Sequence, residues 1–170
     1  MEKHVRPIPE GYHSISPAIT CKNAAAAIEF YKKAFGAKEI NRMEGPGGTI
    51  GHAELRIGDS VIFVSDEMPG MAAAPVPGAT PSSYLFLYIE DCDKVFSRAV
   101  EAGATATMPM QDMFWGDRYG KLTDPFGHSW GVATHIEDVA PEEMQKRSAE
   151  WTAKMAKMSG KAAAAGSKKS

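Results

Sequence analysis

Polar and apolar residues alternate along residues 52–57, a pattern that predicts a strand with one polar face. The polar face carries His52, Glu54 and Arg56. An imidazole beside a carboxylate can move a proton to or from a bound molecule, so His52 and Glu54 are the candidate catalytic residues. A guanidinium next to them can bind an anion, which makes Arg56 a candidate ligand-binding residue.

Three interpretations of this polar face are open. In the first, it is a solvated sheet surface on which Glu54 and Arg56 form an ion pair. In the second, it lines a cavity in which His52 contacts a ligand and Glu54 acts as a base. In the third, the His-x-Glu pair supplies two ligands of a divalent metal, which requires two further donors from elsewhere in the chain.

A second group of candidate binding residues lies in the segment 113–120, which reads Met-Phe-Trp-Gly-Asp-Arg-Tyr-Gly. Trp115 and Tyr119 offer flat surfaces for stacking, and Arg118 offers parallel N–H groups for an anion. Such a set is typical of a small-molecule pocket. The alternative is that the aromatic residues cap the core or lie in a dimer interface.

Aromatic residues also alternate along a third segment. Tyr84, Phe86 and Tyr88 fall on one face of a predicted strand, and the aliphatic residues between them fall on the other. The aliphatic face suits packing on a helix. A row of three aromatic rings on the opposite face predicts a lined cavity, so we expect these three residues to bind the ligand.

The elements that must position these groups occur twice. Each unit consists of a strand, a capped amphipathic helix that ends in Gly-Ala, and three more strands. Neither unit is large enough to enclose a sizeable core alone, so we expect an α+β fold of two paired βαβββ modules that form a curved mixed sheet around a cavity, plus a C-terminal helix. The predicted divisions are a first module at 12–66, a linker at 67–82, a second module at 83–138, the helix at 141–158 and a disordered tail at 159–170.

Local signals set the ends of these elements. Asn23 is placed to cap a first helix that ends before Gly36, and Asp91 is placed to cap the second helix. A strand precedes the first helix over residues 13–21, and Gly58-Asp59 predicts a two-residue hairpin. The helix side chains expected to pack on their own sheets are Tyr31, Phe35, Val95, Phe96 and Val100.

Composition limits the classes of function. The chain has 170 residues, of which 44% are hydrophobic and 24% charged, as in an ordinary globular protein. A net charge of −2 gives no reason to expect nucleic acid, and no apolar run is long enough for a membrane span. Cys21 and Cys92 lack the spacing of a zinc site or a disulfide framework, which favours a cytoplasmic protein.

Several of these segments together resemble the vicinal-oxygen-chelate superfamily, which includes glyoxalase I, bleomycin-resistance proteins and extradiol dioxygenases. The first half carries the resemblance in Ala27-Ile28-Glu29-Phe30-Tyr31 with Phe35-Gly36, in the segment 52–60, and in Ser65-Asp66-Glu67. The turn Asp124-Pro125-Phe126-Gly127-His128-x-Trp130 resembles the PhnB-like branch. The resemblance covers residues 12–138, and it implies the paired-module fold and a homodimer.

In the metalloenzymes of this superfamily, His and Glu side chains from the first and last strands of each module hold a divalent metal. The resemblance places Ser16 and Phe63 at these positions in the first module, and Tyr84 and Gly131 in the second. None of these residues offers a carboxylate or an imidazole, so the familial metal site is expected to be absent. We therefore predict no cofactor, and a divalent metal only through a non-standard site.

Two functions of different class follow. The first is a metal-independent small-molecule-binding protein of the glyoxalase/bleomycin-resistance type, which takes a partly aromatic or anionic compound into the cavity between modules or subunits. The second is a metal-dependent or acid–base lyase, isomerase or dioxygenase of the same superfamily, with a non-standard site at His52 and Glu54. We favour the first, as a homodimer with no nucleic-acid or membrane partner.

Overall fold

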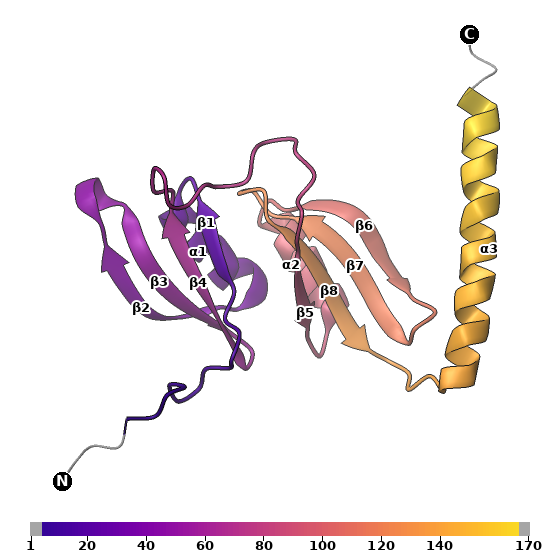
Figure 1. Ribbon diagram of the computed structural model, residues 1–170, viewed down its shortest axis with the longest axis horizontal. Coiled ribbons are helices and arrows are strands. Elements are labelled where there is room, and N and C mark those ends of the chain that lie inside the picture. The colour runs from indigo at the N-terminus through magenta and orange to yellow at the C-terminus, as the bar shows by residue number, and fades with distance from the viewer. Residues whose placement is uncertain (1–4, 167–170) are drawn as a thin grey trace.

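The computed structural model describes residues 5–166, and side chains as far as residue 158. Each βαβββ unit forms its own four-stranded sheet with one helix against it (Figure 1). The first unit comprises β1 (Ala18–Cys21), α1 (Ala24–Phe35), β2 (Lys38–Glu44), the 3-10 turn η1 (Pro46–Gly48), β3 (Ile50–Ile57) and β4 (Ser60–Asp66). The second comprises β5 (Leu85–Tyr88), α2 (Cys92–Glu101), β6 (Thr105–Asp112), β7 (Asp117–Thr123) and β8 (Ser129–His135), and is followed by α3 (Pro141–Gly166).

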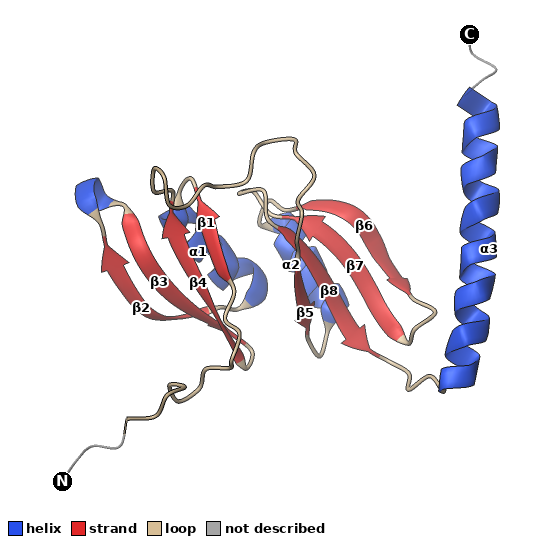
Figure 2. Ribbon diagram, viewed as in Figure 1, coloured by secondary structure: helices blue, strands red, loops and turns tan. Residues whose placement is uncertain are grey.

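Both sheets have the same topology (Figure 2). The strand order is β1-β4-β3-β2 in the first sheet and β5-β8-β7-β6 in the second. In each, the first strand pairs in parallel with the last, and the register repeats, since Ala18 lies opposite Phe63 and Phe86 lies opposite Gly131. The α+β class and the duplicated βαβββ unit are confirmed.

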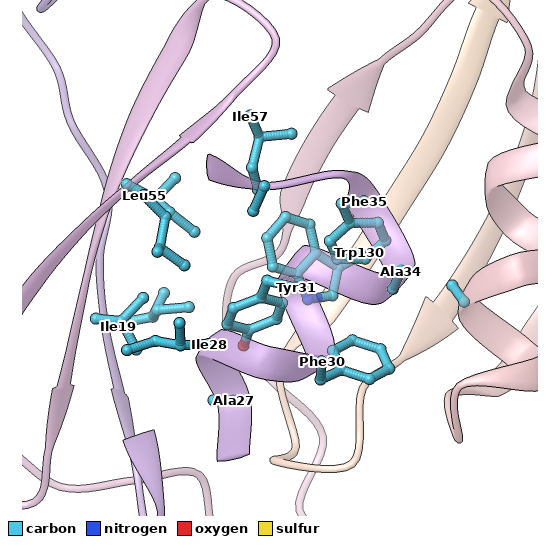
Figure 3. Packing of buried hydrophobic residues seen from close by; sticks show 14 of the residues in the cluster. Ile19, Ala27, Ile28, Phe30, Tyr31, Ala34, Phe35, Leu55, Ile57 and Trp130 are labelled. Atoms are coloured by element: carbon cyan, nitrogen blue, oxygen red, sulfur yellow. The ribbon is translucent and has the colours of Figure 1, made fainter. Parts of the chain in front are cut away.

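The two helices lie between the sheets. Helices α1 and α2 contact each other, and each also contacts strands of its own sheet. Figure 3 shows Trp130 of β8 among the aromatic side chains of α1, with Leu55 and Ile57 of β3 in the same group of buried residues. The space between the modules of one chain is therefore core, and the face of each sheet that carries no helix points outward.

Two names are used below for these helix-free faces. The first outer face carries His52, Glu54, Arg56 and Phe63. The second outer face carries Tyr84, Phe86, Tyr88, Tyr119, Lys121 and Gly131.

A buried carboxylate joins the two modules within the core. Asp124, in the turn before β8, accepts hydrogen bonds from the Tyr31 hydroxyl at 2.8 Å and from Trp130 Nε1 at 2.9 Å. Phe35 packs on Trp130 with ring centroids 4.5 Å apart. Because Tyr31 and Phe35 belong to α1, side chains of both modules complete one aromatic cluster.

The predicted helix ends are confirmed. The side chain of Asn23 accepts a hydrogen bond from the Ala26 N–H, and Gly36 has a φ of 69°, in the left-handed region that ends helices. Asp91 likewise accepts from the Lys94 N–H. The burial of four predicted helix side chains is also confirmed, namely Tyr31, Phe35, Val95 and Phe96.

One predicted helix contact and the predicted start of the first strand are wrong. Val100 is exposed, because the last turn of α2 buries Ala99 instead. The first strand begins at Ala18 rather than at residue 13, because Pro17 has no N–H to donate to a ladder. Residues 5–17 form an arm outside the sheet.

The C-terminal helix is longer than predicted. It continues past residue 158 to Gly166, in a stretch rich in alanine and lysine, both good helix formers. The disordered tail is therefore wrong for residues 159–166, and residues 167–170 lie outside the described part of the chain. None of the helices in the described residues is long and apolar enough to cross a membrane.

Candidate binding faces

The first outer face brings together two predicted polar residues. His52 Nε2 lies 3.2 Å from Glu54 Oε1, and Tyr12 from the N-terminal arm donates a hydrogen bond to Glu54 Oε2. Arg56 instead donates to the carbonyl oxygen of Gly11 at 3.1 Å. The arm therefore lies across this face, and the ion pairs of the described residues do not include one between Glu54 and Arg56.

These contacts govern the charge of Glu54. The hydrogen bond from Tyr12 is the largest cause that lowers the pKa of Glu54 below its ordinary value, and His52 adds to it, while partial burial acts in the opposite direction. A general base works best when its pKa lies near the working pH. Glu54 is thus better suited to orient His52 and Tyr12 than to accept a proton itself.

The second outer face carries a continuous aromatic surface. Tyr84, Phe86 and Tyr88 share one face of the sheet, as predicted, and in the single chain this face points outward and leaves them 51%, 41% and 60% exposed. The aliphatic residues between them pack on the core. Phe86 stacks on Tyr119 of β7, with ring centroids 5.4 Å apart and planes 10° from parallel, and lies 4.9 Å from the Tyr88 ring.

Gly131 allows these two rings to approach the sheet closely. A Cβ atom at this position would lie 2.8 Å from the Tyr119 ring and 3.2 Å from the Phe86 ring. Any side chain there would therefore displace the stacked pair. The resemblance places a metal ligand at Gly131, but in the structure aromatic rings pack directly on this residue.

The residues at the familial metal positions do not fit a metal. Their side chains supply no imidazole or carboxylate, and aromatic rings cover one of the positions. Within the described residues, no three His, Cys, Asp or Glu side chains are close enough together to hold a metal ion elsewhere. The predicted absence of a cofactor stays a prediction.

Sequence reasoning missed a buried carboxylate at one end of the second outer face. Asp117 is 2% exposed and accepts hydrogen bonds from the Tyr88 hydroxyl, from Trp115 Nε1 and from His135 Nδ1 at 2.8–2.9 Å. The signal in the sequence is the β7–β8 hairpin, whose register places Asp117 opposite His135. The hydrogen bond from the Tyr88 hydroxyl to Asp117 links the aromatic row on β5 to the first residue of β7.

The pair of His135 and Asp117 should make stability depend on pH. Hydrogen bonds with Asp117 and, after it, Asp138 raise the pKa of His135 above its ordinary value of 6.5. A raised folded-state pKa stabilises the fold fully below about pH 6.5, and this contribution is lost as the pH rises through the folded value. We expect the Tm difference between the wild type and His135→Gln to be largest below pH 6.5 and to shrink above it.

Thermal unfolding followed by circular dichroism from about pH 5 to about pH 9 measures this difference. The effect should be small, because His135 is half exposed and solvent screens its ion pairs. His13→Gln, in the exposed part of the arm, is the control and should show no such trend. A Tm difference for His135→Gln that stays constant with pH would contradict the prediction.

Arg118 does not lie on the second outer face, and its predicted binding role stays a prediction. Strand alternation puts Arg118 on the opposite side of β7 from Asp117 and Tyr119, where it faces α2. Its guanidinium donates to Asp93 Oδ1 at 2.8 Å and to Asp112 Oδ1 at 2.9 Å. The guanidinium that was expected to bind a ligand anion is therefore already hydrogen-bonded to two carboxylates of the protein.

Trp115 lies at the edge of the second outer face, in contact with the C-terminal helix region. Its ring lies 5.1 Å from Phe114 and 5.9 Å from Tyr119. Trp151 of α3 packs on Phe114 at 5.8 Å. Trp115 is thus part of a small second core between β7 and α3, and its binding role stays a prediction.

A cleft under the linker offers little chemistry for binding. It is lined by β1, by the turn before β8, by Tyr84 and Leu85, and by linker residues at 73–76 and 79–83, which are small or proline apart from Val76. Its imidazole, His128, already lies 3.0 Å from the carbonyl oxygen of Thr20. The two outer faces, with their aromatic and charged side chains, are the better candidates for a ligand.

Comparison with known proteins identifies the family of this chain. Residues 13–132 match the model of the Glyoxalase/Bleomycin resistance protein/Dioxygenase superfamily. An uncharacterised protein of Mycobacterium bovis is 40% identical over 137 residues, which cover 78% of this chain and 90% of that protein.

Solved structures share the architecture. The crystal structure of TioX from Micromonospora sp. ML1 superposes with a TM-score of 0.60 at 26% identity, over 73% of this chain and 99% of that one. A PhnB protein from Bacillus cereus, described as a putative 3-demethylubiquinone-9 3-methyltransferase, superposes with a TM-score of 0.57 over 72% and 99%. At 19% identity the second likeness concerns the fold alone.

Proposed function

The chain belongs to the glyoxalase/bleomycin resistance protein/dioxygenase superfamily, and from that premise we propose that it is a small-molecule-binding protein that works without a metal. Its ligand, a partly aromatic or anionic compound, lies on the second outer face. Because one fold serves many functions, the proposal rests on this face and not on the family. Within the superfamily we place the chain in the PhnB-like branch, on the turn at residues 124–130.

The row of exposed aromatic rings is the observation that carries the proposal. Tyr84, Phe86 and Tyr88 present exposed apolar surface on the sheet face opposite α2, and the buried Tyr119 ring packs against Phe86. Exposed apolar patches of this kind mark binding sites, and aromatic rings favour planar partners that can stack on them.

Metal independence is supported by the residues at the familial ligand positions. A metalloenzyme site there would need oxygen or nitrogen donors, and in the second module the stacked Phe86 and Tyr119 rings take that space. The chain's own residues therefore supply the recognition: aromatic stacking, hydrogen-bonding hydroxyls and charge.

We further propose that a second copy of the chain closes the binding face. Within one chain the two outer faces point away from each other, so a cavity lined by both needs two chains, as in a homodimer. A cytoplasmic location fits the two unpaired, buried thiols of Cys21 and Cys92.

A second candidate function is acid–base catalysis on the first outer face. The specific observation in its favour is the contact of His52 with Glu54, to which Tyr12 adds a hydroxyl. Because the pKa of Glu54 is lowered, its carboxylate would orient the His52 imidazole in this function and would not act as the base itself.

Binding of naphthalene-1-carboxylate and of its uncharged analogue naphthalene-1-carboxamide tests the proposal. We expect at least one of the two to bind, and Phe86→Ala to weaken it by about tenfold through loss of stacking surface. Isothermal titration calorimetry measures the affinity, and EDTA should leave it unchanged.

Val100→Ala is the matched control, because Val100 is exposed on α2 and lies on neither outer face. It should bind like the wild type. If Phe63→Ala lowers the affinity and Phe86→Ala does not, the site lies on the first outer face. Binding abolished by EDTA would contradict metal independence.

A further inference from the structure

Lys121 brings a positive charge onto the aromatic surface. It projects from β7 on the same side as Tyr119, two residues earlier, and its backbone lies opposite Gly131 of β8. Its Nζ atom lies 4.6 Å from the centre of the Tyr84 ring, in a cation–π contact. The side chain is only partly exposed, so the ammonium is held against the surface.

No carboxylate neutralises this charge. Lys121 takes part in none of the ion pairs of the described residues, whereas Lys32, Arg118 and Arg147 are each paired. The strand segments around it, 82–88, 105–111 and 129–134, contain no Asp or Glu. Asp117, at the far end of β7, already accepts three hydrogen bonds.

The charge and the stacking surface are adjacent. The Phe86 ring lies 6.3 Å from the Tyr84 ring and 5.4 Å from the Tyr119 ring. Tyr84, which contacts the Lys121 ammonium, is therefore next to the stacked pair of Phe86 and Tyr119. A planar ligand stacked on Phe86 would place a substituent next to Lys121. A lysine ammonium is a compact donor of three hydrogen bonds that suits an oxyanion.

We propose that Lys121 is the residue that recognises the ligand's charge, and that the ligand is a planar aromatic compound bearing an oxyanion, such as a carboxylate or a sulfonate, next to its ring. This inference rests on the proposed function and specifies its ligand class. It also assigns to Lys121 the anion contact that the sequence had suggested for Arg118.

The affinity ratio of naphthalene-1-carboxylate to naphthalene-1-carboxamide tests this role, because the two probes have the same ring system and differ in charge. In the wild type we expect the carboxylate to bind about tenfold more tightly or better, as for a charge-assisted hydrogen bond. In Lys121→Met the ratio should fall close to one, while binding of the carboxamide is unchanged. Lys121→Arg should retain most of the preference.

Lys94→Met, an exposed position on α2, makes the same change of charge away from the face and should keep the wild-type ratio. A ratio that Lys121→Met leaves unchanged overturns the role of Lys121 and leaves the proposed function standing. Failure of both probes to bind the wild type overturns the proposed function instead. Weaker self-association of Lys121→Met in sedimentation, with an unchanged ratio, would also overturn the proposal and assign Lys121 to a contact between copies.

Discussion

Replacing Phe35 by alanine is expected to lower the free energy of unfolding by about 3–5 kcal/mol, the usual range for emptying an aromatic core position. Phe35 is 3% exposed, and its ring packs on Trp130 from the other module and on Phe30 and Tyr31 of its own helix. The cavity would open where the two modules meet, so neighbouring side chains of one module cannot fill it alone.

Urea unfolding followed by circular dichroism and by tryptophan fluorescence measures this loss. The two signals should give the same midpoint, because the modules share the core that Phe35 helps to form. Ile15→Ala, at an exposed position of the arm, is the control and should change stability by less than about 0.5 kcal/mol. A loss below about 1 kcal/mol for Phe35→Ala would mean that the site collapses without a cavity.

Asp124→Ala is expected to destabilise the protein by about 2–6 kcal/mol. The substitution removes the acceptor for the Tyr31 hydroxyl and Trp130 Nε1, both fully or almost fully buried. A buried donor left without a partner costs about 1–3 kcal/mol, and two such donors are created at once. The N–H groups of Phe126 and His128 lose the same partner.

The same urea titration measures the effect, with two comparison variants. Asp124→Asn keeps one acceptor oxygen and should fall between the wild type and alanine. Asp59→Ala, in the exposed β3–β4 hairpin, should stay within about 0.5 kcal/mol of the wild type. Equal stability of Asp124→Ala and Asp59→Ala would show that Asp124 does not hold the modules together.

Local sequence signals were sufficient for the ends of the first two helices and for the two faces of β5. Asn23, Gly36 and Asp91 act within one turn of a helix, so their roles do not depend on the rest of the fold. The alternation of aromatic and aliphatic residues in β5 is equally local, and it correctly placed Tyr84, Phe86 and Tyr88 on the face opposite the aliphatic residues.

The grouping of site residues followed the sequence motif and not the alternation within the strand. Arg118 was grouped with Trp115 and Tyr119 as one set of binding residues, but Arg118 and Tyr119 are neighbours in β7, so their side chains point to opposite faces and Arg118 faces α2. The same alternation turns Lys121 outward, toward Tyr84.

The orientation of the modules could not be predicted from either half alone. It is set by contacts between distant residues, such as Tyr31 with Asp124 and the Arg98 guanidinium with the carbonyl oxygen of Ala34. These contacts place the helices back to back and turn both helix-free faces outward. Periodicity identifies an apolar helix face but not which of two sheets, or which other helix, covers it.

The shared core also gives the linker between β4 and β5 a thermodynamic role. A chain with a single module would expose the apolar surface of its helix, and two such chains would have to meet in solution to bury it. By joining the modules, the linker makes that encounter intramolecular, at an effective concentration that is typically millimolar for a short connection. The two modules meet in an interface like that between two separate chains, but this interface forms at any protein concentration because both modules belong to one chain.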